Sequence, residues 1–189
     1  MSRLKNPVGP EDHVQGHPDA ECTLVEYGDY QCPYCGAAYP IVKKIQAHFG
    51  NRLRFVFRNF PMSELHPWAE PAAEVAEFAA VHGKFWQMHD LLYENQHSFG
   101  DALFMQLAQA LKLSPVQLDE SIAQHTFLSR IRADFSSGVR SGVNGTPTFF
   151  INGERHNGPF EFDSLRAAID RASAGSASNP PHVSSAKHS

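Results

Sequence analysis

The sequence predicts an α/β domain in which a small β-sheet is interrupted by a long helical insertion. A strand, a helix and a second strand follow one another within residues 23–58. About 75 residues of helical pattern without a strand signal come next, and strand signals then return at residues 147–152. A chain of 189 residues that is 42% hydrophobic fits one compact domain.

The first three elements predict a parallel pair of strands. Residues 23–28 form a β-rich run, and residues 52–58 alternate charged and apolar side chains at both ends. Between them a helix begins at Pro33, which suits the first helical position, and Gly50 supplies its end. Pro40 lies inside this helix and is expected to kink it. A strand, helix, strand order requires a crossover, so the two strands should run parallel.

The middle of the chain, about residues 62–142, is predicted to be a helical insertion rather than a second domain. Neither strand group can make a stable sheet alone, so the two groups should join. Ser114 and Pro115 form an N-cap followed by a proline at the first helical position. Apolar residues at helical spacing predict helices at 67–82, 84–94, 101–112, 115–123 and 128–142.

The last elements predict a hairpin and a closing helix. An Asn-Gly pair, the strongest short hairpin signal in the chain, joins a strand at 147–152 to a returning strand at 154–157. A helix is predicted over residues 163–172. Residues 174–189 are small, polar and aperiodic, which predicts a disordered tail after a single domain over residues 1–173.

Composition excludes several functions. The 16 Lys and Arg residues against 20 Asp and Glu residues give a net charge of −4, which argues against binding of nucleic acid or anionic membranes. No apolar run is long enough to span a membrane, and three cysteines are too few for a disulfide-stapled secreted domain. The opening residues lack the apolar segment of a signal peptide. We therefore expect a cytoplasmic protein, or a periplasmic or extracytoplasmic one if a leader has been removed.

The motif that carries chemistry is Cys-Pro-Tyr-Cys at residues 32–35, between the first strand and the first helix. A cysteine at a helix N-terminus faces the helix dipole and unbonded N–H groups, and both favour the thiolate. A second cysteine one turn later is close enough to close a disulfide. The alternative is half of a zinc site, which usually needs four ligands, and the only other cysteine is Cys22. We expect a redox pair and no metal.

A second motif extends this interpretation. Pro147 opens a core-like strand directly after a glycine turn, which is unusual unless its peptide bond is cis or it starts the strand. Glu-Tyr-Gly-Asp-Tyr-Gln before the cysteine pair, the helical block, and Gly-Thr-Pro-Thr-Phe-Phe-Ile-Asn-Gly together resemble the DsbA-like branch of the thioredoxin superfamily. The resemblance covers about residues 12–173. It implies a thioredoxin-like fold with an all-helical subdomain inserted between the second strand and the cis-proline strand.

The resemblance also implies an activity. Members of this branch are thiol–disulfide oxidoreductases, which form, reduce or exchange disulfides in protein or peptide substrates without a cofactor and depend on a redox recycling partner. By similarity, Cys32 is the exposed nucleophile and Cys35 the resolving thiol of a redox-active disulfide. Pro147 is expected to be cis and to pack against the two sulfurs.

Four further positions take roles from the same resemblance. The backbone of Thr146 is expected to pair with an extended substrate segment, beside Pro33 and Tyr34. Glu26 matches an acid beneath the active site that carries a proton during exchange, and burial should raise its pKa. Tyr34 stands where the more oxidising members carry histidine. A neutral tyrosine cannot stabilise the Cys32 thiolate by charge, whereas the helix terminus still can.

Two alternative functions are compatible with the same predicted fold. One is a redox-inert binding module or holdase. The other is a relative of the kappa-class glutathione transferases or isomerases, which normally lack the second cysteine, so Cys35 argues against it. Among the remaining residues, Cys22 is interpreted as a structural thiol, and His66 as a surface or capped histidine.

Overall fold

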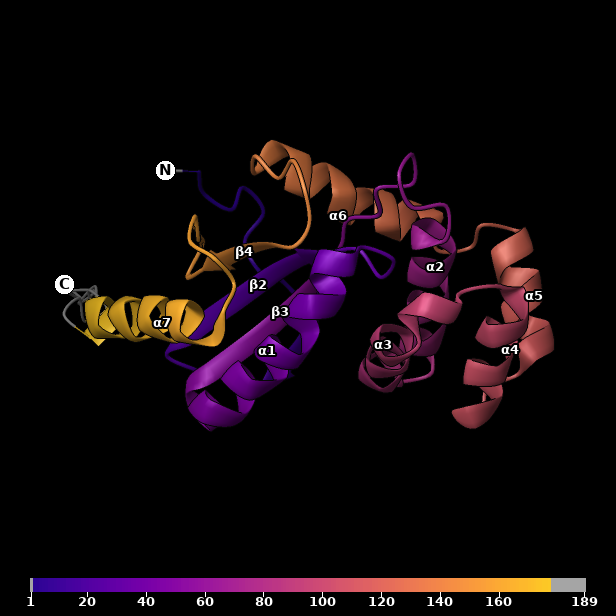
Figure 1. Cartoon of the computed structure of the whole chain (residues 1–189), viewed down its shortest axis with the longest axis horizontal. Helices are drawn as coiled ribbons and strands as arrows, with labels where there is room; N and C mark the ends of the chain where they lie inside the picture. The colour runs from indigo at the N-terminus through magenta and orange to yellow at the C-terminus, as the bar shows by residue number, and fades with distance from the viewer. Residues whose placement is uncertain (1, 178–189) are drawn as a thin grey trace, which may run out of the picture.

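The computed structural model describes residues 2–177 and contains one mixed β-sheet flanked by helices (Figure 1). The sheet has five strands in the order β1-β3-β2-β4-β5. The strands are β1 (His13–Gly16), β2 (Cys22–Gly28), β3 (Leu53–Asn59), β4 (Thr148–Ile151) and β5 (Glu154–Arg155). The α/β fold class predicted from the sequence is confirmed.

The central pair of strands, β2 and β3, is parallel, as the strand, helix, strand order predicts. The β4 strand pairs antiparallel with the other side of β2, and β5 returns antiparallel to β4 after the Asn-Gly turn. The β1 strand was not predicted. It is four residues long and pairs antiparallel with β3, so its sequence is too short to show a period of two.

The helix α1 (Pro33–Phe49) begins and ends where the sequence predicts. Pro33 occupies its first turn, and Gly50 follows its last residue with a φ angle of 52°, in the left-handed region that favours glycine. Pro40 lies inside the helix, and the kink expected there stays a prediction. A 3₁₀ turn (Gly50–Arg52) then leads into β3.

The helical insertion has the five helices predicted for it. The cap prediction is also correct, because the Ser114 hydroxyl accepts a hydrogen bond from the N–H of Gln117 at 3.3 Å. Figure 1 shows α2 to α5 gathered beyond one end of the sheet, while α6 runs back over it. The helices are α2 (Ala69–Val81), α3 (Phe85–Glu94), α4 (Asp101–Ala110), α5 (Pro115–Ala123) and α6 (Leu128–Arg140), with a 3₁₀ turn (Gln96–Ser98) after α3.

Both faces of the sheet are covered. Alternate residues of β2 point to opposite faces, so Leu24 belongs to the core beneath α1, whereas Val25 packs with Phe135 of α6. The first of these cores continues from the sheet into the insertion, where Met88 and Phe104 are fully buried in the same cluster. The insertion and the sheet therefore share one hydrophobic core.

The closing helix α7 (Phe162–Ala177) is longer than predicted. It buries Leu165 and Ile169 against the sheet side of the core, as the spacing of these residues predicts. Residues 174–177, predicted as the start of the tail, are helical instead, because a helix that is already formed extends at the cost of ordering one residue at a time. The rest of the predicted tail, residues 178–189, lies outside the described residues. Within residues 2–177 no helix has both the length and the apolarity needed to cross a membrane.

Candidate active site

The two motif cysteines lie where the chain passes from β2 into α1. Cys32 is the N-cap residue with extended backbone angles (φ −67°, ψ 122°), and Cys35 lies in the first turn. Both are free thiols, and the Cys35 thiol donates a hydrogen bond to the Cys32 sulfur. Cys35 is fully buried and Cys32 is 4% exposed. The sequence-based expectation of an openly exposed Cys32 was therefore wrong, since neighbouring loops cover most of its surface.

One of these covering loops carries the second motif. The peptide bond between Thr146 and Pro147 is cis, as the resemblance implies. The Cys32 sulfur lies 3.4 Å from the carbonyl oxygen of Thr146, to which its thiol donates. Thr148 braces the same turn, because its hydroxyl donates to the Gly145 carbonyl at 2.7 Å. The structure thus places the residues just before β4 directly against the Cys32 sulfur.

This environment favours the thiolate form of Cys32. The hydrogen bond from the Cys35 thiol, with further contributions from the Thr146 side chain and from the backbone N–H groups of Tyr34 and Cys35, lowers the pKa of Cys32 to about 5 against an opposing effect of burial. Burial, together with its donation to Cys32, raises the pKa of Cys35 well above its usual value. The Tyr34 side chain is 67% exposed, so this residue contributes its backbone N–H and not its ring. The pair therefore consists of one activated and one protonated sulfur.

Glu26 lies beneath the cysteine pair on β2. Its side chain is 2% exposed, and its Oε1 atom has no hydrogen-bond partner among the described residues. Burial, and to a smaller extent the negative charge at Cys32, raise the pKa of Glu26 to about 8. The burial that was expected to raise this pKa is observed. A carboxyl with this pKa holds a proton near neutral pH and can release it.

Two residues that the sequence analysis did not single out hold the loop before α1. The carboxylate of Asp29 accepts hydrogen bonds from the N–H groups of Gln31 at 2.8 Å and Cys32 at 3.2 Å. From the insertion, the Gln96 amide donates to the carbonyl groups of Tyr30 at 2.7 Å and Cys32 at 2.8 Å. Asp29 lies in the Glu-Tyr-Gly-Asp-Tyr-Gln segment before the cysteine pair, but no sequence spacing indicates that it would hold this loop. Gln96 is 64 residues from Cys32, and only the tertiary fold brings them together.

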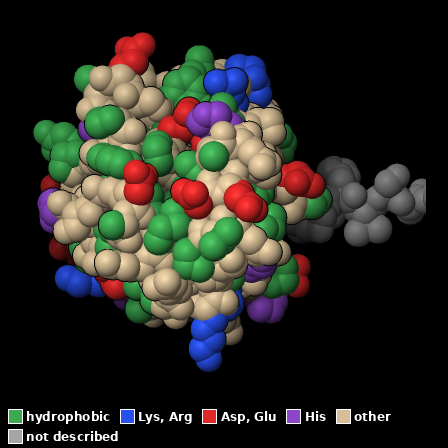
Figure 2. Space-filling model, turned by 90° about the vertical axis from the view of Figure 1, so that its right-hand side faces the viewer, with side chains coloured by type: hydrophobic (Ala, Val, Ile, Leu, Met, Phe, Trp, Pro, Cys, Tyr) green, Lys and Arg blue, Asp and Glu red, His purple; other side chains and the backbone are tan. Residues whose placement is uncertain are grey.

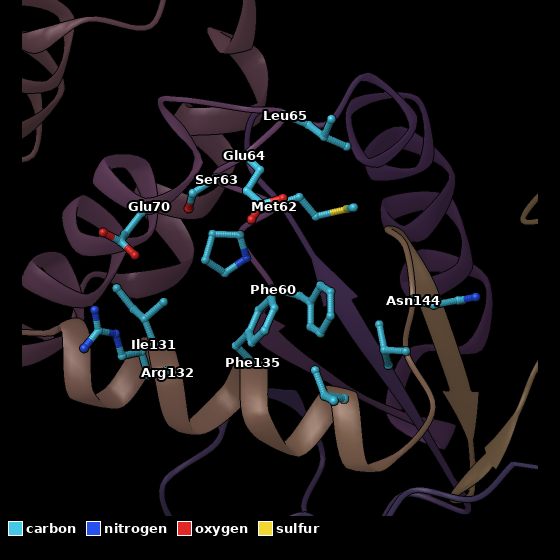
Figure 3. Close-up of a pocket in the computed structure, with 13 residues that line it drawn as sticks. Phe60, Met62, Ser63, Glu64, Leu65, Glu70, Ile131, Arg132, Phe135 and Asn144 are labelled. Atoms are coloured by element: carbon cyan, nitrogen blue, oxygen red, sulfur yellow. The ribbon is translucent and has the colours of Figure 1, made fainter.

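An apolar groove of about 660 Å³ lies beside the cis-proline loop (Figure 3). One wall is the segment of residues 60–65 between β3 and α2, and the other is α6 with Phe135 and Val139. The Met62 sulfur, which lines the groove, is 3.8 Å from the Thr146 hydroxyl. The groove therefore reaches the loop that contacts Cys32.

The remaining candidate residues lie away from the sulfur pair or are inert. Burial raises the pKa of the Cys22 thiol to about 11, so it stays protonated. In the described part of the chain, one group of possible metal ligands comes together, Glu70, Glu74 and His125. Within this group, His125 Nδ1 and Glu74 Oε1 are joined by a hydrogen bond of 3.0 Å. On the face of the insertion in Figure 2, basic side chains are few and lie toward its edges.

The sheet order, the helical insertion and the cysteine pair under a cis-proline loop define a thioredoxin-like protein. The sequence profile of the family described as thioredoxin matches residues 9–171, so the chain belongs to this family. Oxidised BdbD from Bacillus subtilis is similar over 92% of this chain and 99% of its own, with a TM-score of 0.83 and 26% identity. The alpha-DsbA1 structure of Wolbachia pipientis matches 93% of this chain and 96% of its own at a TM-score of 0.79, and at 20% identity it supports the fold alone. The DsbA-like resemblance is confirmed.

Curated relatives of similar sequence carry a different name. The Na(+)/H(+) antiporter NhaA 1 of Salinispora arenicola (strain CNS-205) is 43% identical over 178 residues, which are 94% of this chain. These residues are 27% of that relative, so the chain spans about a quarter of the length of the curated relatives it matches.

Proposed function

We propose that this chain is a thiol–disulfide oxidoreductase that acts on protein substrates through Cys32 and Cys35. The observation that carries the proposal is the environment of the Cys32 sulfur. It sits at the N-terminus of α1, receives a hydrogen bond from the Cys35 thiol and lies 3.4 Å from Thr146 O. A thiolate is the nucleophile in disulfide exchange and also its better leaving group. The Cys35 thiol and the backbone N–H groups at the start of α1 stabilise the Cys32 thiolate near neutral pH, and the contact with Thr146 O places the sulfur beside the cis-proline loop.

In the oxidising direction, the resting protein holds a disulfide between Cys32 and Cys35. A substrate thiolate attacks the Cys32 sulfur, the disulfide breaks, and the Cys35 sulfur leaves and takes up a proton. A second substrate thiolate then attacks the substrate sulfur of the mixed disulfide and releases Cys32 as a thiolate. The substrate is oxidised to a disulfide, and the protein is left with two reduced cysteines. The depressed pKa of Cys32 stabilises this reduced form, which favours oxidation of substrates.

In the reducing direction the same steps run backward. The Cys32 thiolate attacks a substrate disulfide, and Cys35 then attacks Cys32 in the mixed disulfide after losing its proton. Cys35 is buried and its pKa is raised, so its proton needs a nearby acceptor. Glu26, whose own pKa is about 8, is the proposed carrier of that proton in both directions.

The substrate is proposed to lie across the cis-proline loop. A strand of polypeptide can pair with the Thr146 backbone while its cysteine reaches Cys32. Pro33 and Tyr34 are exposed on the other side of the sulfur and would border the bound segment. The groove behind Met62 would receive an apolar side chain of the substrate next to its cysteine. The recycling partner would dock over the same surface, since it must reach the same sulfur.

We further propose that thiol exchange, and not ion transport, is the activity of this chain. An antiporter moves ions across a membrane, and the described residues include no helix that could span one. The match with the relative named as an antiporter covers only about a quarter of that protein's length. One thioredoxin-like domain over residues 1–173 with its insertion at about 62–142 remains our domain assignment, supported by the shared core. The cytoplasmic location stays a prediction, which the reduction potential of the cysteine pair would test.

The experiment pairs two single variants with a reduction assay on a protein disulfide. We expect Cys32→Ser to abolish exchange and Cys35→Ser to accumulate mixed disulfides with substrate, because only Cys32 makes the first attack. Turnover of insulin with dithiothreitol by the unaltered chain distinguishes the enzyme from a redox-inert binding module. An active Cys32→Ser protein, together with a Cys35→Ser protein that captures nothing, would reject the proposed roles. Conjugation of glutathione without disulfide exchange would favour the kappa-class alternative instead.

A further inference from the structure

We propose that Asp29 is a positioning residue that fixes the reactive sulfur relative to the Thr146 edge where a substrate strand pairs. The inference rests on the proposed function and assigns a role to a residue outside the cysteine pair. Asp29 follows β2 directly, and its side chain is completely buried. A buried carboxylate is costly unless each oxygen is hydrogen-bonded, so its partners show what it holds in place.

The first oxygen of Asp29 holds the loop that carries the nucleophile. Its Oδ1 atom accepts from the N–H groups of Gln31 at 2.8 Å and of Cys32 at 3.2 Å. The backbone of Asp29 adds two contacts, because its carbonyl accepts from Cys32 N at 3.1 Å and its N–H donates to the Cys35 sulfur at 3.5 Å. Asp29 thereby holds the N–H side of the Cys32 backbone, while Gln96 holds its carbonyl, and together they fix the direction of the Cys32 side chain.

The second oxygen holds a segment from another part of the chain. Its Oδ2 atom accepts from the N–H of Met62 at 2.9 Å and lies 2.7 Å from Nδ1 of His66. Both residues belong to the connection between β3 and α2, and the N–H of His66 also donates to the Met62 carbonyl at 2.9 Å. His66, interpreted from the sequence as a surface or capped histidine, thus has its ring held by the Asp29 carboxylate.

The two segments meet again at Thr146. Cys32 contacts the Thr146 carbonyl at 3.4 Å, and the Met62 sulfur contacts the Thr146 hydroxyl at 3.8 Å. One carboxylate therefore joins both segments that touch the Thr146 edge, one through each oxygen. Loss of that link leaves the sulfur pair and the groups that lower the Cys32 pKa in place, but frees the sulfur and the edge to shift relative to each other. A shift of this kind slows attack on a peptide substrate, which must pair with the Thr146 edge and reach the Cys32 sulfur at the same time. It affects a small disulfide much less, because a small disulfide needs only the sulfur.

The experiment measures the rate constant for attack by the reduced protein on two disulfides, a peptide disulfide and a small aromatic disulfide. Rates are taken at a pH above the Cys32 pKa, where the thiolate fraction no longer limits them. We expect Asp29→Ala to slow attack on the peptide disulfide about tenfold or more and attack on the small disulfide by less than about threefold. The midpoint of the Cys32 thiolate titration should change little, because Cys35 and Thr146 remain.

Two further variants keep the test decisive if Asp29→Ala does not fold. Asp29→Asn keeps one carbonyl oxygen and can hold only one of the two segments, so its loss with the peptide disulfide should be intermediate. Asp134→Asn is the matched control, because Asp134 is also buried and accepts a backbone hydrogen bond, from Asn59 at 3.0 Å. The control should slow both disulfides equally or neither.

Two results would overturn the positioning role. Equal slowing with the peptide and the small disulfide would mean that Asp29 acts on the nucleophile or on folding in general. Equal downward changes of the Cys32 pKa in Asp29→Asn and Asp29→Ala, with rates that follow the thiolate alone, would mean that it acts by its charge. Failure of the unaltered chain to attack either disulfide is a separate outcome, which would reject the proposed function itself.

Discussion

Replacing Glu26 with glutamine should make the protein more stable at alkaline pH. The Glu26 pKa is about 8 in the folded protein against an ordinary 4.5, so between these pH values the folded state holds a proton that the unfolded state has lost. The stability that Glu26 contributes is thus complete below pH 4.5 and is lost as the pH rises through 8. At 1.36 kcal/mol per pH unit, this interval corresponds to a loss of up to about 5 kcal/mol. Glu26→Gln cannot ionise and should avoid the loss.

The assay is urea unfolding of the reduced protein at several pH values from 5 to 9. Cys32 acts with the opposite sign, because its pKa falls from 9.0 to about 5 on folding and its stabilisation is lost as the pH falls through 5. The first series therefore compares Glu26→Gln with the unaltered chain. The second series makes the same comparison in proteins that also carry Cys32→Ser, which removes the opposing effect of Cys32. The advantage of Glu26→Gln should grow as the pH rises from 5 to about 8 and then level off, in both series. Parallel stability curves would refute the buried, protonated carboxyl, whatever its effect on the exchange rate.

Three further predictions follow from local packing. A Cβ atom at Gly36 would overlap the Gln96 amide, so Gly36→Ala should lower the free energy of unfolding by about 1–3 kcal/mol, and an unchanged value in urea would contradict that contact. Cys22→Ala should keep the exchange rate within about twofold, since that thiol is buried and protonated, and a large loss of turnover would assign it a redox role. Val139→Asp should raise KM for a peptide disulfide with apolar neighbours about threefold or more. The same KM in both proteins would exclude the groove from substrate binding.

The sequence predicted those elements whose signals are local and strong. The start of α1 at Pro33 and the cap at Ser114 each depend on residues within a few positions of one another, and the parallel β2 and β3 pair follows from the order of three consecutive elements. The hydrophobic period, the position of a proline and the capping residues can each be read from a short stretch of sequence. For the same reason β1 was missed, because an edge strand of four residues is too short to show a period of two and is defined only by its partner β3.

At the site, the sequence located the sulfur pair but not its support. The burial of Cys32 depends on Thr146, which is 114 residues away in the chain, and the position of its loop depends on Gln96 and on the 62–66 segment. No spacing rule connects such residues. Burial of a charged residue such as Asp29 is also contrary to its usual place at the surface, so composition alone argues against it.

The central claim is that the fold makes Cys32 an activated thiolate. It is tested most directly by titrating the reduced Cys35→Ser and unaltered proteins, with thiolate absorbance near 240 nm as the readout. In the unaltered protein we predict one sulfur ionising with a midpoint of about 5, and in Cys35→Ser a higher midpoint, to the extent that the serine hydroxyl donates a weaker hydrogen bond than the thiol it replaces. A Cys32 midpoint near 9.0 in the unaltered protein would contradict the account, because the sulfur would then have the pKa of an ordinary thiol that its surroundings do not activate.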